Sequence, residues 1–200
     1  DVDSEDIELR LIEVLTQAGD RYGLQVEFER EVLTEIFEIV DGVELAAGDY
    51  RGTEVELELR SSTKRPVFGE MKLGYGDYYD GKAFKGRTEL SWRPSKHAQL
   101  EIGGGLTSAE LQAGDFDALT SFAGLRVTPS TRMSFNSIVQ YDNQSQQIGI
   151  NNRFRYILKS GSDMYFVFNK GFHRGDDQEF DRFRAFKTET IAKLGWTFQF

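Results

Sequence analysis

The sequence predicts an all-β fold: an antiparallel, up-and-down transmembrane β-barrel of about ten strands, or the carboxyl-terminal part of a larger barrel. Three observations predict this class. Apolar and polar residues alternate along nearly the whole chain, short turns alternate with longer connections, and aromatic residues lie near the ends of the predicted strands. The 200 residues fit a single β-barrel domain, 1–200, in which residues 1–20 are an extra strand or an amino-terminal extension.

Composition excludes several other classes. The 24 basic and 33 acidic residues give a net charge of −9, so we expect no nucleic-acid partner. The absence of cysteine excludes disulfides and thiolate metal sites. No apolar run approaches the ~18 residues of a helical membrane span. Asp1 opens the chain without a signal-peptide pattern, so we expect a mature or excised segment.

The predicted strands follow one another from the start of the chain. Ile7, Leu9 and Leu11 form a first strand, although Ile7, Leu11, Val14 and Leu15 also fit a short helix. The strands expected after it cover residues 22–32, 51–60, 67–75, 84–93, 97–106, 116–127, 132–141, 147–158, 163–172 and 186–200. Residues 116–127 and 163–172 are apolar on both faces, which leaves their orientation open. In the last strand Phe186 is expected on the apolar face.

The connections differ between the two ends of the predicted sheet. Short turns, each containing serine, are expected at residues 61–66, 93–96, 128–131 and 159–162. Longer connections are expected between them, at residues 33–49, 76–82, 107–115, 142–146 and 173–182. An antiparallel meander explains this difference, because every second connection lies at the same end.

Alternation gives each strand an apolar and a charged face. In a membrane barrel lipid covers the apolar face and charged residues line the lumen, whereas a soluble barrel has the reverse arrangement. Strands near the ~9–11 residues needed to cross a bilayer favour the membrane barrel. The residues predicted to face lipid are Val55, Leu57, Leu59, Leu90, Trp92, Leu194, Trp196, Phe198 and Phe200. The residues predicted to line the lumen are Glu54, Glu56, Glu58, Lys85, Arg87, Glu89, Arg153, Arg155, Lys187, Glu189 and Lys193.

Several segments also resemble a known family. The carboxyl-terminal WTFQF (196–200) looks like the terminal signature of bacterial outer-membrane barrels. Six further segments follow in order VELAAGDY (43–50), GDYYDG (76–81), WRPS (92–95), VQYDN (139–143), NNRFR (151–155) and GSDMYFVFN (161–169). This ordered set resembles the carboxyl-terminal barrel domain of large bacterial outer-membrane proteins that often carry an amino-terminal domain similar to carbohydrate-binding module family 9.

The resemblance implies an orientation and raises a question of strand number. With Phe200 at the periplasmic end, the short turns are periplasmic and the longer loops extracellular. Single-chain bacterial barrels use even strand numbers. Either residues 5–16 are not a strand, which leaves ten, or the chain ends a larger barrel whose other strands come from elsewhere.

We therefore expect a passive pore or the membrane anchor of a surface assembly in the bacterial outer membrane, and not an enzyme. The expected partners are outer-membrane lipid and further barrel strands or subunits; no cofactor and no metal site is expected. The charged faces either set a field across a pore or pair between strands. Tyr78 and Tyr79 could stack on a sugar or anchor the barrel at the membrane interface.

Other functions remain as alternatives. The chain could be a structural subunit completed by partner strands, or a soluble ligand-binding β-barrel. A hydrolase built on His97 or His173 comes last, because no motif places a nucleophile or a second acid beside them.

Overall fold

The regular structure of the chain is entirely β-strand wherever it is described. The computed structural model describes residues 4–174 and 183–196. The strands are β1 (Ser4–Leu15), β2 (Arg21–Leu33), β3 (Phe37–Val40), β4 (Val43–Leu45), β5 (Gly48–Arg60), β6 (Val67–Tyr78), β7 (Gly81–Ser95), β8 (Ala98–Leu111), β9 (Gly114–Ser130), β10 (Met133–Asp142), β11 (Gln147–Lys159), β12 (Ser162–Arg174) and β13 (Phe183–Trp196). In this part of the chain, no helix is long and apolar enough to cross a membrane.

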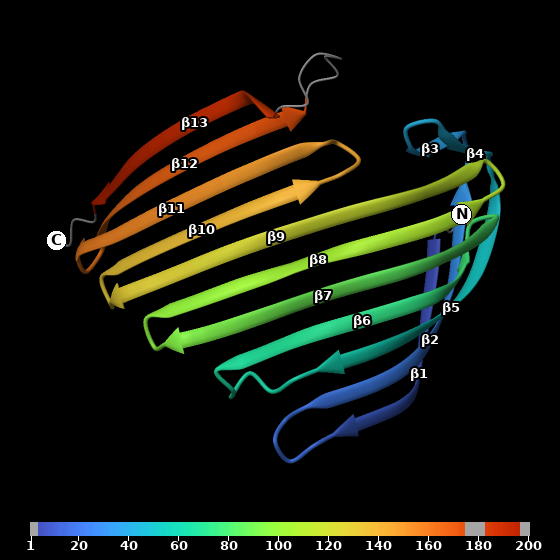
Figure 1. Ribbon diagram of the computed structural model, residues 1–200, viewed down its shortest axis with the longest axis horizontal. Coiled ribbons are helices and arrows are strands. Elements are labelled where there is room, and N and C mark those ends of the chain that lie inside the picture. The colour runs from blue at the N-terminus through green and yellow to red at the C-terminus, as the bar shows by residue number, and fades with distance from the viewer. Residues whose placement is uncertain (1–3, 175–182, 197–200) are drawn as a thin grey trace. The chain divides into compact units, whose positions relative to one another are not determined.

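The strands follow one another in the sheet as they do along the chain. Within the described residues, one sheet of eleven strands has the order β1-β2-β5-β6-β7-β8-β9-β10-β11-β12-β13, and β3 and β4 form a separate hairpin (Figure 1). The predicted fold class, all-β with antiparallel up-and-down strands, is confirmed. Ser4–Leu15 is a strand, as the alternation of Ile7 and Leu9 predicted, so the described sheet has eleven strands and the alternative that left residues 5–16 out of it is wrong.

The chain divides into two compact units. Unit 1 comprises Asp1–Leu90 and Gly104–Leu119, and unit 2 comprises Ser91–Gly103 and Thr120–Phe200. Each unit is described by itself below.

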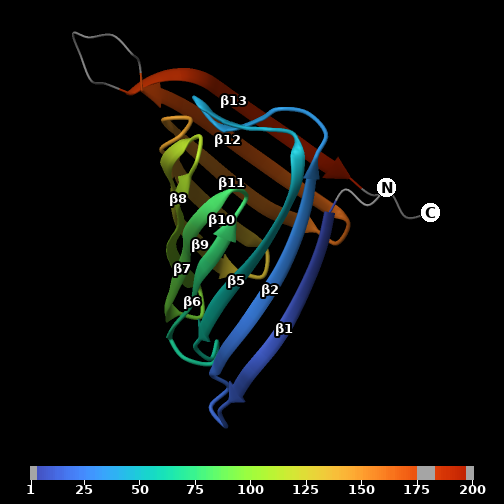
Figure 2. The ribbon, with the colours of Figure 1, turned by 90° about the vertical axis from the view of Figure 1, so that its right-hand side faces the viewer.

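In unit 1, strands β1, β2, β5 and β6 lie side by side (Figure 2). Their register aligns the apolar residues of neighbouring strands. One row across these strands reads Ile12, Leu24, Leu57 and Leu73, and the next reads Leu9, Val26, Val55 and Tyr75. Directly opposed side chains are the pairs that stabilise a sheet. Yet these side chains are not covered by other parts of the unit, since Ile12 is 56% exposed and Tyr75 61% exposed.

A β-bulge keeps the first strand in this arrangement. Arg10 pairs with Gln25 and Ile12 with Leu24, so Leu11 has no partner of its own. A bulge inserts one residue without moving the rest of the strand to the opposite face. Ile7 and Ile12 therefore share the apolar face, and the alternative of a short helix with Ile7, Leu11, Val14 and Leu15 on one side is wrong.

Unit 2 repeats the two-faced arrangement. One row across β10 to β13 reads Phe135, Phe154, Phe166 and Ala192, and another reads Met133, Tyr156, Met164 and Leu194. These rows resolve the orientation that the sequence left open, because Phe166 lies on the apolar face and Tyr165 and Val167 lie on the other.

The predicted position of Phe186 is wrong. Gly171 pairs with Lys187 and Phe172 with Ala185, so Phe186 lies in a bulge. A Cβ on Gly171 would lie 2.8 Å from the Phe186 ring, which places this ring over Gly171. Gly171 shares the face of Asn169 and Lys187, so Phe186 packs on the charged face and not beside Leu194.

The connections agree only in part with the prediction. The four short turns connect the expected pairs of strands, β5 and β6, β7 and β8, β9 and β10, and β11 and β12. Two of them lie later than expected, because β7 continues to Ser95 and β9 to Ser130. The prediction of longer connections at 76–82 and 107–115 is wrong. β6 continues to Tyr78 and β8 to Leu111, so only two residues separate each of them from the next strand. The strands extend beyond the apolar pattern from which they were predicted. Part of the connection at 173–182 lies outside the described residues.

The β3–β4 hairpin contains the buried part of unit 1. Val43 and Leu45 of the hairpin cluster with Ala83, Ala109 and Leu111, and Leu45 is only 1% exposed. Ala83 alternates in phase with Lys85 along β7, so the hairpin packs on the charged face of the sheet. The sequence predicted this segment as part of a loop, residues 33–49.

Candidate functional site

The charged face of unit 1 begins with an acidic wall, which we define as Glu8, Glu27, Glu54, Glu56 and Glu58 of β1, β2 and β5. Glu8 pairs with Glu27, and Glu27 pairs with Glu54, so three carboxylates follow one another across three strands. Like charges in directly opposed positions destabilise a sheet. An acidic row of this kind points to a role other than strand pairing.

Lys72 and Gln25 bind carboxylates in the middle of the acidic wall. The Lys72 ammonium lies 3.1 Å from the Glu56 carboxylate, and the Gln25 amide donates to Glu56 at 3.1 Å and to Glu27 at 2.9 Å. Gln25 is 4% exposed and Glu58 is 8% exposed. The sequence prediction included Glu56 and Glu58 but missed Lys72, whose alternation with Glu70 on β6 was the available signal.

Glu54 reaches a cation two strands away. The Lys85 ammonium lies 2.7 Å from the Glu54 carboxylate, although β6 separates their strands. The position between them on β6 is Gly74, where a Cβ would overlap the Glu54 carboxylate. Glycine is required here for a close approach, and the spacing Gly74-Tyr-Gly76 was the sequence signal for it.

Arg87 and Glu89 continue the face of Lys85 along β7. Both are exposed, and β7 alternates so that Ala83, Lys85, Arg87 and Glu89 share one side. The predicted set Glu54, Glu56, Glu58, Lys85, Arg87 and Glu89 therefore lies on a single face of unit 1.

In unit 2 the predicted charged residues gather around Tyr165. The guanidinium carbons of Arg153 and Arg155 lie 5.0 Å and 5.2 Å from the Tyr165 ring centroid, and Lys193 pairs with Tyr165 in the register. Arg155 also forms an ion pair with Asp163 at 2.8 Å.

Glu189 and Lys187 complete this face of unit 2. The amide of Asn169 donates to Glu189 at 3.2 Å, and Asn151 donates in turn to Asn169. Lys187 is opposite Gly171. The predicted residues Arg153, Arg155, Lys187, Glu189 and Lys193 thus share one face, as the alternation predicted.

The residues predicted to face lipid lie on the opposite face. Leu57 is 37% exposed and Leu194 is 64% exposed, and Val55, Leu90, Trp92 and Trp196 are also exposed. Leu59 pairs with Tyr22 and Met71 in the same apolar rows and is partly buried. Phe198 and Phe200 lie outside the described residues.

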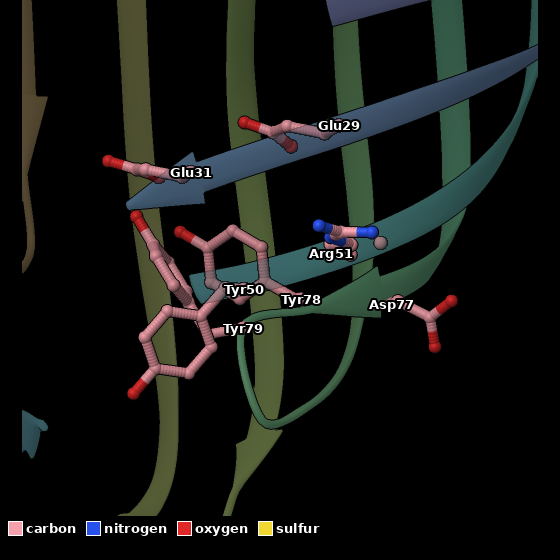
Figure 3. A pocket seen from close by; sticks show the side chains of 8 residues that line it. Glu29, Glu31, Tyr50, Arg51, Asp77, Tyr78 and Tyr79 are labelled. Carbon is pink, nitrogen blue, oxygen red and sulfur yellow. The ribbon is translucent and has the colours of Figure 1, made fainter. Parts of the chain in front are cut away.

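A tyrosine cluster lies where the acidic wall meets the hairpin. Tyr50, Tyr78 and Tyr79 line one pocket with Glu29 and Glu31, and Figure 3 shows the three rings gathered beside Glu31. Arg51 and Asp77 also line this pocket, but Asp77 points away from the rings (Figure 3). The sequence prediction singled out Tyr78 and Tyr79 and missed Tyr50, which is brought to them by the β5–β6 pairing.

The far end of unit 1 holds an ionic anchor between two turns. Arg65 donates to both carboxylate oxygens of Asp20, at 2.5 Å and 2.7 Å, and the Ser62 backbone N–H donates to Asp20 at 2.8 Å. These bonds favour the charged form and lower the pKa of Asp20, the Arg65 hydrogen bond most strongly. Asp20 thereby joins the β1–β2 turn to the β5–β6 turn.

The two histidines show no catalytic grouping in the described part of the chain. The His97 ring Nδ1 is 2.8 Å from the Thr128 carbonyl oxygen, and His173 is opposite Gln147 in the strand register. The acidic residues of 176–181 lie outside the described ranges. Among residues 4–174 and 183–196, no group of three or more histidine, aspartate or glutamate residues could hold a metal ion.

Comparisons with known proteins give two structural similarities. No family model matches the chain, and no curated protein matches it. A solved structure described as a KdgM porin aligns with 98% of this chain and 98% of its own, at 9% sequence identity and a TM-score of 0.38. A second, described as a KdgM porin in complex with disordered oligogalacturonate, aligns with 98% of each chain at 12% identity and a TM-score of 0.37.

Proposed function

We propose that the chain forms an outer-membrane β-barrel that acts as a passive pore. The observation that carries this proposal is the separation of the two sheet faces, which recurs independently in both units. Val55, Leu57 and Tyr75 are exposed in the apolar rows of one face, while Glu54, Glu56 and Lys85 form contacts on the other. Lipid tails can cover the apolar face, and water in a lumen can solvate the charged face.

The alternative of a soluble ligand-binding barrel requires the opposite arrangement. A soluble barrel buries its apolar face in a dry centre. The buried hydrophobic cluster among the described residues instead lies on the charged face, where Val43 and Leu45 of the β3–β4 hairpin meet Ala83 and Leu111. Exposed apolar surface of this extent marks contact with a partner or a membrane.

The same hairpin narrows the proposed pore. Because β3 and β4 pack on the face that carries Lys85, they occupy lumen rather than surrounding lipid. Ala83, Ala109 and Leu111 supply an apolar patch in an otherwise polar wall, and Leu45 covers it. We infer a constriction at the end of unit 1 where β2 leads into β5.

The odd number of strands supports a further partner strand. An up-and-down sheet of the eleven described strands leaves its first and last strands, β1 and β13, running in the same direction. Antiparallel closure needs an even number. We propose that a strand from a longer chain or another subunit pairs with the outer edge of β1. A cysteine introduced at Glu8, in this cysteine-free sequence, should attach to that strand in intact membranes when it is treated with a reagent that joins a thiol to an amine.

Two finer assignments also belong to this proposal. The ordered segments of the sequence support membership in the carboxyl-terminal barrel domains associated with module family 9. A role as the membrane anchor of a surface assembly follows from that membership. It predicts that the barrel co-purifies with other surface components.

Planar bilayer recordings test the pore directly. The refolded chain should conduct, and neutralising the acidic wall with Glu56→Gln and Glu58→Gln should reduce its preference for cations. Lys72→Gln should raise that preference. Arg51→Gln is the control for Lys72→Gln, because it also removes one positive charge, but from a side chain that is 72% exposed. Refolded protein that inserts into bilayers without conducting would refute the pore.

A further inference from the structure

We propose that a hollow on the apolar face of unit 1 is a binding site for one anionic phospholipid. An acyl chain of this lipid lies against Tyr22, Leu59 and Met71, and its phosphate lies at Arg65. The inference rests on the proposed function, in which lipid covers this face. Basic pockets beside apolar, membrane-facing surface are recurrent sites for anionic lipid headgroups.

The hollow lies where the apolar rows of this face end. Tyr22, Leu59 and Met71 form the last apolar row of β2, β5 and β6 before the β1–β2 and β5–β6 turns. With Asp20 and Arg65 they line an open hollow of about 380 Å³, all of it within unit 1. Ligand sites in proteins have volumes of about 300–1,000 Å³. The hollow is therefore large enough for part of a lipid, and it has an apolar side and a charged end.

Gly69 leaves the hollow open because it has no side chain on this face. It alternates in phase with Met71 along β6, so a side chain at this position would point outward. A Cβ there would lie 2.5 Å from the Glu89 carbonyl oxygen on β7, so the close approach of the two strands requires glycine. Tyr22 and Leu90 beside it are 44% and 46% exposed. The backbone thus sets the hollow, and the neighbouring side chains do not fill it.

The exposed charge at the end of the hollow is positive. The two turns, residues 16–20 and 61–66, contain one carboxylate, Asp20, and two cations, Lys64 and Arg65. The Asp20 side chain is 10% exposed, whereas that of Arg65 is 46% exposed and Lys64 is also exposed. Of the ion pairs recorded within residues 4–174 and 183–196, none includes Lys64. This end therefore complements an anionic headgroup.

Asp20 orients Arg65 without using all of its donors. Arg65 Nη1 and Nη2 each donate to one oxygen of Asp20, at 2.5 Å and 2.7 Å. A guanidinium has five N–H donors, so the Nε–H and one proton on each Nη remain for a phosphate. The headgroup meets a cation that is already held in position, which reduces the entropic cost of binding.

The position along the sheet determines the kind of lipid. The hollow lies at the end of the short turns, which is the periplasmic end of an outer-membrane barrel. The periplasmic leaflet of this membrane consists of phospholipids, whereas lipopolysaccharide forms the outer leaflet. Tyr22 adds an aromatic ring at the headgroup level, where such rings are enriched. An anionic phospholipid therefore fits both the location and the charge.

Native mass spectrometry of the full chain, refolded in a non-ionic detergent, tests the preference for charge. The probes are phosphatidylglycerol and phosphatidylcholine with the same acyl chains, offered at equal concentration. One phosphatidylglycerol should be retained about three- to tenfold more than phosphatidylcholine. Equal retention of the two lipids, or preferential retention of diphosphoryl lipid A, would overturn the inference.

Photolabelling in vesicles separates a site from the general lipid layer. A phosphatidylglycerol with a diazirine near the ester end of its acyl chain should label Met71 and Leu90, which line the hollow. Val14 is the internal control, because it belongs to the same row as Tyr22 but lies outside the hollow. Equal labelling of Val14 would mean a boundary lipid only and would refute the site.

Variants test the two ends of the hollow separately. Thr88→Phe adds a ring to the lining without changing the charge, and Lys64→Gln removes a cation that the ionic anchor does not use. Each should reduce the preference for phosphatidylglycerol by at least about twofold. The double variant Asp20→Asn/Arg65→Gln removes the anchor without leaving an unpaired carboxylate, and it should lose most of the preference.

Matched controls make the same changes at the other end of unit 1. Thr53→Phe and Lys82→Gln lie outside the hollow, and both should retain phosphatidylglycerol as the native chain does. An unchanged preference in both Thr88→Phe and Lys64→Gln, or an equal reduction in the controls, would refute the site.

Bilayer recordings separate this inference from the proposed function. A chain that conducts but shows no lipid preference supports the pore and refutes the site. A chain that binds phosphatidylglycerol in the hollow without conducting supports the site and refutes the pore. Photolabelling of the charged face around Glu56 would contradict the orientation of the two faces, and with it both proposals.

Discussion

Lys85 Nζ lies 2.7 Å from Glu54 Oε2 across an intervening strand, and Gly74 leaves the space in which they meet. Gly74→Ala should displace the Glu54 carboxylate, which is the movable end of a side chain, and break this ion pair. We expect a loss of about 1–2 kcal/mol in the free energy of unfolding, because Glu54 is nearly buried and Lys85 only partly so.

A neighbouring glycine gives the matched contrast. A Cβ at Gly76 would overlap the backbone of Thr53 and Glu54, which cannot move aside without disturbing the β5–β6 pairing. Gly76→Ala should therefore unfold at clearly lower denaturant than Gly74→Ala. At Gly149 no atom lies within 4 Å of the added Cβ, so Gly149→Ala should behave as the native chain. Equal effects at all three positions would contradict the packing described.

A charge on the apolar face should be costly. Leu57 lies between Leu24 and Leu73 in an apolar row. Leu57→Arg should destabilise the protein folded in lipid vesicles by about 2–4 kcal/mol. Leu57→Met is the control, with an expected change below about 1.5 kcal/mol. Denaturant titration in vesicles measures both. A well-tolerated arginine would mean that lipid does not contact this face.

Acid should weaken the anchor between the two turns. The folded state lowers the pKa of Asp20, so its contribution to stability is present above the ordinary aspartate pKa of about 3.9 and is lost as pH falls toward the lower folded value. Unfolding measured between pH 2 and 7 should show this loss in the native chain. In Asp20→Asn the stability should be lower at neutral pH and less dependent on pH in this acidic range.

The hairpin should control the width of the pore without holding the sheet together. Leu45→Ala removes a side chain that is 1% exposed and should weaken hairpin docking by about 2–3 kcal/mol. Larger and noisier single-channel currents are the expected result. Ile36→Ala, at a side chain that is 67% exposed beside the same hairpin, should leave the currents unchanged. Unchanged currents in both variants would contradict the constriction.

The sequence predicted the strands well because alternation is a local property. Val55, Leu57 and Leu59 opposite Glu54, Glu56 and Glu58 can be read from ten consecutive residues, and the structure keeps them on two faces. The two residues whose predicted face was wrong, Leu11 and Phe186, both lie at bulges. A bulge depends on the register with a neighbouring strand, which alternation within one strand does not contain.

The candidate site was less predictable because its contacts are distant in the sequence. Val43 and Leu45 appeared as ordinary loop residues, since their partners Ala83, Ala109 and Leu111 lie on β7 and β8. Tyr50 likewise joins the other tyrosines only after β5 and β6 pair. Side-chain types could be identified from the sequence, but the grouping required the fold.

The bulge at Leu11 has a consequence for how length changes act on this sheet. Without Leu11, Leu9, Ile12 and Val14 would alternate without interruption, so β1 behaves as a regular strand carrying one inserted residue. The insertion is absorbed at a single point and leaves both halves of the strand in phase. A deletion elsewhere, such as at Gln25 within β2, has no bulge to compensate for it. It would move the side chains of half the strand to the opposite face of the sheet. The first strand is therefore the natural place for this protein to gain or lose a residue.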